Sequence, residues 1–234
     1  MRASMFLTRE LAARTVARGE NIDTTCRGCH VAVESQSHIL GKCRATQAER
    51  VNRHNSVCAY IARRLRTGSG TGARSIVIHR EHTITIDPGE IEGLTRRILL
   101  KPDVVITNTR IVILEVSVVY ESHRVGEIDP LRRVRREKMN KYDILKRVLA
   151  ARFGKPVSIR TLIVGCRGGW LATNNKLFKD LGVSFSVLDR NACVERAVWG
   201  SILTFNRFLH HTREAPHVST LGTSHCCLLG PVVE

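Results

Sequence analysis

With 234 residues, of which 43% are hydrophobic and 25% charged, the chain has room for one ordinary domain and a small module, and its composition excludes wholesale disorder. The 37 Lys and Arg against 21 Asp and Glu give a formal net charge of +16, so we expect a polyanionic partner, and nucleic acid rather than an anionic membrane. Because no apolar run approaches the roughly 18 residues of a membrane span, and the opening lacks a signal peptide's apolar centre, we expect an intracellular protein.

The first part of the chain divides into three predicted segments. Residues 1–22 have the pattern of an exposed basic helix or arm, and a cysteine-rich module follows at 23–45. Beyond it, apolar residues recur at helical spacing and predict an amphipathic helix. These residues are Val51, Cys58, Ile61 and Leu65. The glycine-rich run 67–74 has no periodicity and predicts a flexible connection after the helix.

The module at 23–45 carries a set of possible zinc ligands with the spacing C-x2-C-x8-H-x4-C. The ligands are Cys26, Cys29, His38 and Cys43. Three thiolates and one imidazole complete a tetrahedral zinc shell, and metal binding supplies folding free energy that so short a segment cannot obtain from burial. His30 is an alternative to His38 as the fourth ligand. Three other cysteines lie in apolar surroundings, where we expect small buried residues rather than ligands. They are Cys58, Cys166 and Cys193.

Short runs rich in β-branched residues follow the glycine-rich segment and predict strands. The runs are SIVIH at Ser75, VVIT at Val104 and IVILEVSVV at Ile111. Residues 108–110 predict a tight hairpin turn between the last two of these strands. A strongly basic helix is expected over about 131–153, and then a strand that begins near Ser158. The predicted order is helix, three strands, helix and strand, an α/β arrangement.

Two carboxylates stand out in KPDVVITNTRIVILEVSVVY. The predicted hairpin brings Asp103 and Glu115 to the same end of the sheet, close enough to share a divalent cation. Glu115 interrupts an apolar strand, where a lone charge costs several kcal/mol unless it is paired with a cation or a base. The alternative for Glu115 is an edge-strand carboxylate that faces water.

The basic side chains of the next helix complete this candidate site. Ser117 shares a strand face with Glu115 but supplies no charge, whereas Lys138 and Lys141 lie along the sheet-facing stripe of the helix, from which one of them can reach the metal. Four arginines on the rest of the helix surface are expected to contact phosphates, with a solvated basic face as the alternative. They are Arg132, Arg133, Arg135 and Arg136. Glu137 is an extra ligand or, as we favour, an ion-pair partner.

KPD followed after eleven residues by an acidic residue resembles the PD-(D/E)XK nuclease core, with its lysine moved to a later helix as in the restriction-like endonuclease of site-specific non-LTR retrotransposons. Those elements also carry a CCHC knuckle before the nuclease, an Arg-His-Asn element and a K-x2-K-Y element. Here these elements are Arg53, His54 and Asn55, and Lys138, Lys141 and Tyr142. The motifs occur in the same order, and the resemblance covers roughly residues 6–208.

The resemblance implies a restriction-endonuclease-like domain at 46–210, preceded by the zinc knuckle at 23–45 and followed by a flexible tail at 211–234. It also implies a nuclear, magnesium-dependent DNA endonuclease that nicks target DNA to prime reverse transcription of the element's RNA. Magnesium would bind to Asp103 and Glu115, while Lys138 or Lys141 assists catalysis. Residues expected to contact DNA, besides the four arginines, are Arg53, His54, Asn55 and Tyr142, with a general-base role as the alternative for His54.

Two other functions stay open at this point. The first is a non-catalytic zinc-knuckle module, left from such an element, that binds DNA or RNA. The second is a host repair or restriction nuclease with the same core. Since the reverse transcriptase region of these elements lies outside this sequence, we expect a carboxy-terminal fragment, a split product or a decayed copy.

Overall fold

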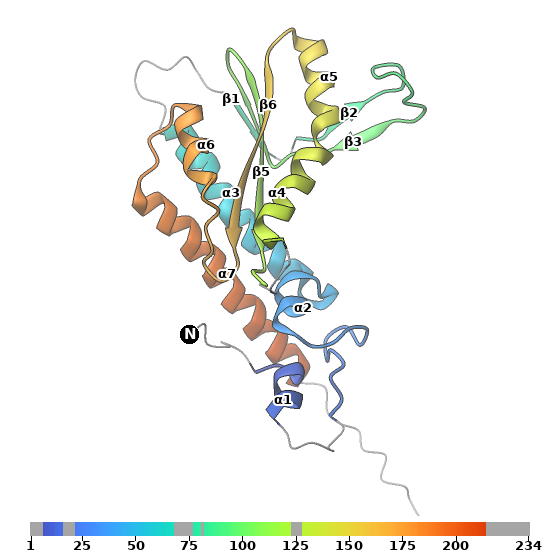
Figure 1. Cartoon of the computed structure of the whole chain (residues 1–234), viewed down its shortest axis with the longest axis vertical. Helices are drawn as coiled ribbons and strands as arrows, with labels where there is room; N and C mark the ends of the chain where they lie inside the picture. Colours follow the sequence, from blue (N-terminus) through green and yellow to red (C-terminus); the bar gives the residue numbers. More distant parts are fainter. Residues whose placement is uncertain (1–6, 16–21, 68–76, 81, 123–127, 214–234) are drawn as a thin grey trace, which may run out of the picture.

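The computed structural model describes residues 7–15, 22–67, 77–80, 82–122 and 128–213 (Figure 1). Most of the predicted glycine-rich connection and of the predicted tail lies outside the described residues, as does much of the predicted basic arm. Within that arm the structure has one short helix, α1 (Arg9–Thr15). None of the helices in the described residues is long and apolar enough to cross a membrane.

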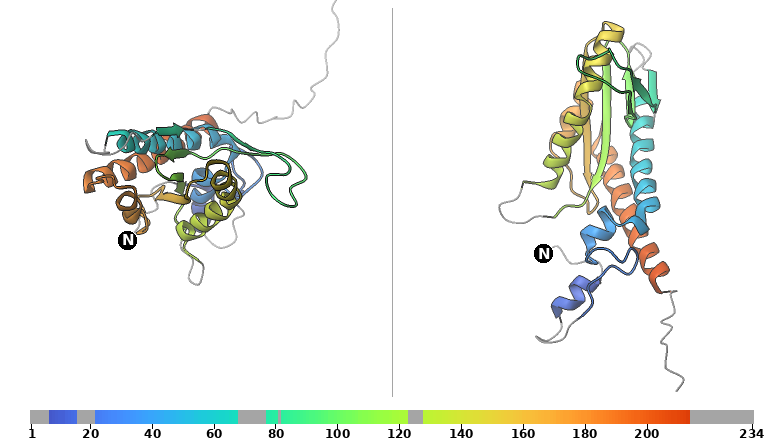
Figure 2. Two further views of the ribbon diagram at one scale, coloured as in Figure 1. Left: turned by 90° about the horizontal axis from the view of Figure 1, so that it is seen from above. Right: turned by 90° about the vertical axis from the view of Figure 1, so that its right-hand side faces the viewer.

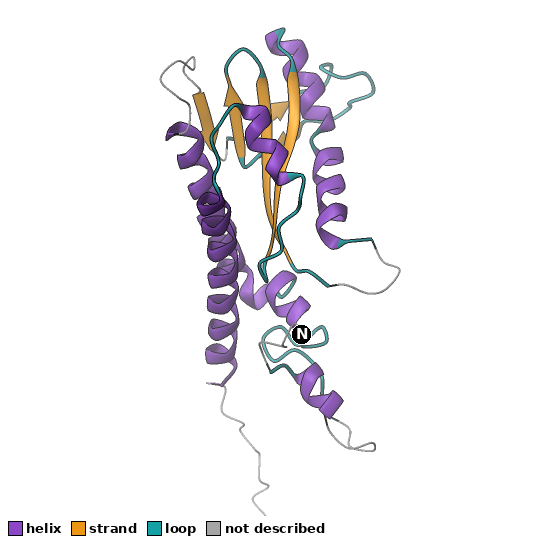
Figure 3. Ribbon diagram, turned by 60° about the vertical axis from the view of Figure 1, so that its left-hand side comes forward, coloured by secondary structure: helices purple, strands orange, loops and turns teal. Residues whose placement is uncertain are grey.

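A mixed four-stranded sheet forms the centre of the fold, in the strand order β1-β4-β5-β6. The strands are β1 (Val77–Arg80), β4 (Val104–Thr107), β5 (Ile111–Val119) and β6 (Val157–Gly165). The β1-β4 and β4-β5 pairs are antiparallel, whereas β5 and β6 run parallel over their whole length. A parallel pair needs a crossover connection, and here two helices supply it (Figure 3). The chain is therefore a mixed α/β protein with the predicted hairpin at its centre.

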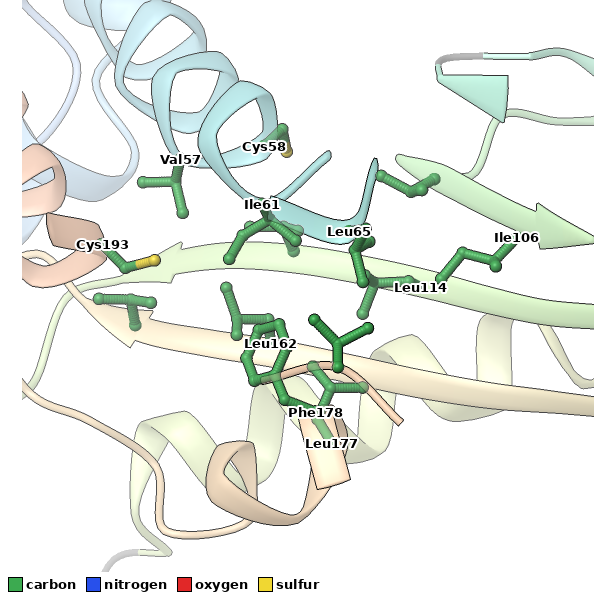
Figure 4. Close-up of a cluster of buried hydrophobic side chains, with 14 of the residues drawn as sticks. Val57, Cys58, Ile61, Leu65, Ile106, Leu114, Leu162, Leu177, Phe178 and Cys193 are labelled. Carbon is green, nitrogen blue, oxygen red and sulfur yellow. The ribbon is translucent and has the colours of Figure 1, made fainter. Parts of the chain in front are cut away.

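Strand β5 has buried apolar side chains on both faces of the sheet, since other elements cover both faces. On one face lie α3 (Gln47–Thr67), α6 (Asn174–Leu181) and α7 (Val187–Arg213), and the short helix η1 (Arg44–Thr46) directly precedes α3. Figure 4 shows the core beneath α3, where Ile61 and Leu65 meet Leu114 and Leu162. Three of the four residues whose spacing predicted this helix are buried, whereas Val51 is 48% exposed.

The other face is covered by α4 (Pro130–Lys141), α5 (Asp143–Phe153) and a second, two-stranded sheet. That sheet consists of β2 (Ile84–Ile86) and β3 (Ile98–Leu100), inserted between β1 and β4, and was not predicted. The prediction of a single helix over 131–153 was wrong, because the structure has two helices there. Tyr142, with φ −98° and ψ 4°, separates α4 from α5, and its buried ring and its hydroxyl, which donates to the Lys101 carbonyl at 3.0 Å, hold the break in place.

The long helix α7 packs against α3 along its course (Figure 2). Cys193 and Ala197, in its first half, belong to the core of the main sheet. Phe205 and Phe208, further along, belong to a separate buried cluster with the cysteines of the module at 23–45 and with α2 (Gln36–Gly41). The helix α7 therefore contributes side chains to the core of the main sheet and to the buried cluster around the cysteines.

Candidate functional site

The cysteines and the histidine of the amino-terminal module converge on one point. The ligand atoms of Cys26, Cys29, His38 and Cys43 all lie within 4.8 Å of one another. Cys26 Sγ is 3.8 Å from Cys43 Sγ, and Cys29 Sγ is 3.2 Å from His38 Nε2. His30, the alternative ligand, is exposed at a positive φ of 57° and is not part of this group. The set fits a tetrahedral zinc ion in number and in donor chemistry.

Local structure positions these ligands. A bridge between Thr25 and Val33 closes the first loop, and Ser35, which accepts a hydrogen bond from the His38 N–H, caps α2 so that the helix presents His38. Glu34 is fully buried and accepts hydrogen bonds from the backbone and side chain of Arg27 and from the backbone of Arg9. Sequence reasoning missed Glu34; a single acid in a short polar stretch has no pattern that distinguishes it from a solvated residue.

Without a cation, burial raises the pKa of the Cys26 thiol, whereas hydrogen bonds from the backbone and from the other two thiols outweigh burial and lower the pKa of Cys29. Burial, reinforced by the neighbouring thiol of Cys26, raises the pKa of Cys43 to about 12. A bound cation reverses this effect, because a thiolate that ligates a metal is stabilised in its charged form. The donor set and the burial of its three cysteines are thus consistent with a zinc-binding module.

A second group of charged side chains lies at the start of β4 and in the middle of β5. The Asp103 N–H donates to Glu115 Oε1 at 3.1 Å, and the Val116 N–H donates to Asp103 Oδ2 at 2.8 Å. The Glu115 side chain is 1% exposed and that of Asp103 is 17% exposed. The hairpin register brings the two carboxylates together, with one buried and the other open to solvent.

Lys138 of α4 completes this group. Its Nζ lies 2.9 Å from Glu115 Oε2. Burial and the nearby charge of Asp103 raise the pKa of Glu115, and Lys138 opposes that shift. Lys141 lies differently: its Nζ donates to the Tyr142 hydroxyl at 3.2 Å and sits 4.8 Å from the centre of that ring. Of the two candidate lysines, Lys138 is the one that contacts a carboxylate of the pair.

His54 of α3 joins the same group from the opposite side. Its Nε2 is 3.3 Å from Asp103 Oδ2 and 3.1 Å from the Val116 carbonyl oxygen. Burial lowers the pKa of His54, but the hydrogen bonds with Asp103 and Cys58 outweigh burial and raise it to about 11. A protonated His54 therefore holds the Asp103 carboxylate. The sequence singled out His54 but did not connect it with Asp103, since nothing in a linear pattern reports a contact between α3 and β4.

Two residues expected to contact DNA are buried. Arg53 is 4% exposed, and its guanidinium donates to Ser201 Oγ and to the Leu40 carbonyl, both at 2.9 Å, so it joins α3 to α7 and α2. Tyr142 is 1% exposed and forms the break between α4 and α5. In this structure, hydrogen bonds within the fold use polar groups of both side chains. The half-buried Asn55 lies beside His54, with Oδ1 3.2 Å from His54 Nδ1.

The basic surface of α4 lies next to Lys138. The side chains of Arg132 and Arg133 are 77% and 60% exposed. Arg136 is exposed too, and Arg135 is half-buried. Glu137 pairs with Arg133 at 3.7 Å and is 64% exposed, which matches the ion-pair role that we favoured for it.

The fold and the amino-terminal cluster together define a mixed α/β protein with a Cys3His site. No family model matches the chain. Two retrovirus-related Pol polyproteins from the type-1 retrotransposable element R2 of Popillia japonica resemble it, one 24% identical over 204 residues and one 29% identical over 185 residues. The aligned regions cover 85% and 76% of this chain but 38% and 27% of those proteins. The chain is thus distantly homologous to R2 Pol polyproteins over most of its length.

Proposed function

We propose that this chain is the metal-dependent DNA endonuclease of a non-LTR retrotransposon, which nicks target DNA to prime reverse transcription of the element's RNA. The observation that carries the proposal is the group formed by Asp103, Glu115 and Lys138, in which carboxylates from the start of β4 and the middle of β5 lie beside a lysine of α4. A restriction-like core at 46–210, a zinc knuckle at 23–45, target DNA and element RNA as partners and a nuclear location belong to the same proposal.

The pair of carboxylates has the chemistry of a magnesium site. Mg²⁺ prefers carboxylate oxygens and keeps several waters, and Asp103, with its partly exposed side chain, leaves room for them. When bound, the ion would polarise the scissile phosphate and lower the pKa of an attacking water. Asp103 and Glu115 are the residues that would hold it.

Other charged residues near the two carboxylates contact the DNA phosphates or position the proposed magnesium ligands. Lys138 is the catalytic lysine in this proposal, since its ammonium group already lies at the carboxylates and can neutralise charge that builds on the phosphate. His54 positions Asp103 by holding one carboxylate oxygen. The four arginines of α4 continue the positive surface outward from Lys138 and are suited to contact the DNA backbone.

Nicking of supercoiled plasmid tests the proposal. The wild-type protein is expected to nick with magnesium and not with EDTA. Asp103→Ala and Glu115→Ala should lose nicking while they still bind DNA, whereas Glu92→Ala, an exposed acid between β2 and β3, should nick like the wild type. A wild-type protein that binds DNA but never nicks it would identify a non-catalytic nucleic-acid-binding module instead.

A further inference from the structure

A cysteine that the proposed reaction does not use lies within the reach of two candidate ligands. Cys58 is one helical turn after His54 on α3, and its Sγ is 3.7 Å from His54 Nδ1 and 3.5 Å from His54 Nε2. Asp103 contributes a carboxylate oxygen, and one ligand atom from each of the three residues lies within 4.8 Å of the others. In the part of the chain that the structure describes, one other group has this property, the Cys3His cluster.

The donor set differs in kind from the pair of carboxylates. Magnesium prefers oxygen donors, whereas one sulfur, one nitrogen and one oxygen suit zinc and its thiophilic analogues cobalt and cadmium. Residues four apart on a helix present their side chains to the same side, so α3 positions two of the donors by its own geometry. Three protein ligands leave the fourth position of a tetrahedral ion free for water or another small ligand.

We propose that His54, Cys58 and Asp103 form a second metal site, for a thiophilic divalent cation such as zinc, which shares the Asp103 carboxylate with the proposed magnesium site. Binding forms bonds from the metal to Sγ, to an imidazole nitrogen and to a carboxylate oxygen. The Cys58 thiol and the ligating nitrogen of His54 release their protons to solvent as the metal enters. Cys58 is 3% exposed, so water does little to stabilise its thiolate, and a bound cation would balance that charge.

The shared carboxylate has a functional consequence, which rests on the proposed nuclease activity. A zinc ion held by His54 and Cys58 withdraws Asp103 from magnesium and places a tightly bound cation where a more weakly bound, exchangeable one is needed. Zinc therefore acts as an inhibitor of the magnesium-supported reaction. The binding part of the inference does not depend on that activity.

Counting zinc ions by native mass spectrometry tests the binding. The full chain, saturated with zinc, is expected to hold two ions, one of them at the Cys3His cluster. Cys58→Ser and His54→Gln should each hold one. Cys193→Ser is the matched control, since Cys193 is a fully buried thiol that belongs to neither group of ligands, and it should hold two. Thermal melting monitored by circular dichroism checks that each variant is folded, and the two ligand variants test the site through different side chains.

A wild-type chain that holds a single zinc ion, or a folded Cys58→Ser that still holds two, would overturn the inference. The competition experiment then uses plasmid nicking at fixed magnesium with increasing zinc. The zinc concentration that halves the nicking rate, each protein being compared with its own zinc-free rate, should rise roughly tenfold or more in Cys58→Ser. If the wild type nicks no DNA at all, the proposed function fails, while the count of zinc ions still decides the metal site.

Discussion

The ion pair between Lys138 and Glu115 lies half inside the protein, since the Glu115 side chain is 1% exposed and that of Lys138 is 29% exposed. Removal of the lysine leaves a buried carboxylate beside the negative charge of Asp103. We expect Lys138→Met to lower the free energy of unfolding by about 2 kcal/mol, less than for a fully buried pair because water reaches the lysine. Urea unfolding at neutral pH measures this.

A double variant distinguishes the contribution of the ion pair to stability from the contribution of side-chain packing. Lys138→Met combined with Glu115→Gln removes both charges, so much of the lost stability should return. Lys141→Met is the control, because Lys141 contacts the Tyr142 ring and hydroxyl rather than a carboxylate of the pair. If Lys138→Met and Lys141→Met lowered the free energy of unfolding equally, the stabilisation would not come from the ion pair between Lys138 and Glu115.

Gly28 of the cysteine-rich module packs closely against α7. A Cβ atom at this position would lie 2.7 Å from Phe208 Cε2 and 3.0 Å from Ala45 Cβ. Gly28→Ala is therefore expected to cost about 1–3 kcal/mol, as overpacking of a core does. Gly41→Ala is the control, since the nearest atom to its added Cβ is Tyr120 Cβ at 3.9 Å. Thermal melting of both variants decides, and an unchanged melting temperature for Gly28→Ala would contradict the packing described.

At the scale of elements, Asp189 near the start of α7 ties that helix to α3. It accepts hydrogen bonds from the Tyr60 hydroxyl at 2.7 Å and from the Ser186 N–H at 2.8 Å, and it pairs with Arg64. Burial opposes ionisation of the carboxyl, but these contacts outweigh burial and lower the pKa of Asp189 from 3.8 to about 2. The ionised carboxylate thus stabilises the contact between the two helices.

The depressed pKa sets the pH range of this stabilisation. Because the folded pKa lies below the unfolded one, the contribution is fully present above pH 4 and is lost as the pH falls toward 2. Asp189→Asn should therefore be less stable than wild type by about 2 kcal/mol at pH 6, and the difference should shrink below pH 4. Urea unfolding at several pH values measures it. If the difference in the free energy of unfolding between wild type and Asp189→Asn stayed constant down to pH 3, the lost stability would come from packing rather than from the carboxylate charge.

The elements that the sequence predicted are those with a local signal. The β4-β5 hairpin follows from two β-branched runs around a tight turn, and the contact between Asp103 and Glu115 follows from that hairpin. The three-residue strands β2 and β3 are too short to show alternation. The break at Tyr142 depends on a hydrogen bond to Lys101, 41 residues earlier, and no helical pattern records it. The burial of Arg53 has the same origin, since Ser201 lies 148 residues away.

On the scale of the whole molecule, the apolar cluster around the Cys3His site extends beyond the predicted module boundary. Phe205 and Phe208 of α7 and Cys166 after β6 pack against Cys26 and Cys29. A shortened chain that starts at residue 46 would expose this surface. We expect it to bind the dye ANS, which reports exposed apolar surface, and to melt at a lower temperature than the full chain.

Removal of metal from the full chain should reproduce part of this effect. Chelation leaves the polypeptide intact but withdraws the ion that we propose for the cluster, and the melting temperature is expected to fall without a change in the sheet signal of circular dichroism at low temperature. Truncation and chelation together show whether the cysteine-rich module at 23–45 folds independently or as part of the larger domain. If the shortened chain melted at the temperature of the full chain, the two parts would be separate folding units.

Because α7 carries Cys193 and Ala197 into the core of the main sheet and Phe205 and Phe208 into the cluster around the cysteines, one continuous helix joins the two clusters, and we expect ligand binding near one to be coupled to ligand binding near the other. Such coupling is equal in both directions. DNA bound at the carboxylates would then raise the affinity for zinc at the cysteines by the factor with which zinc raises the affinity for DNA. The retention of zinc during dialysis, with and without DNA, measures this coupling.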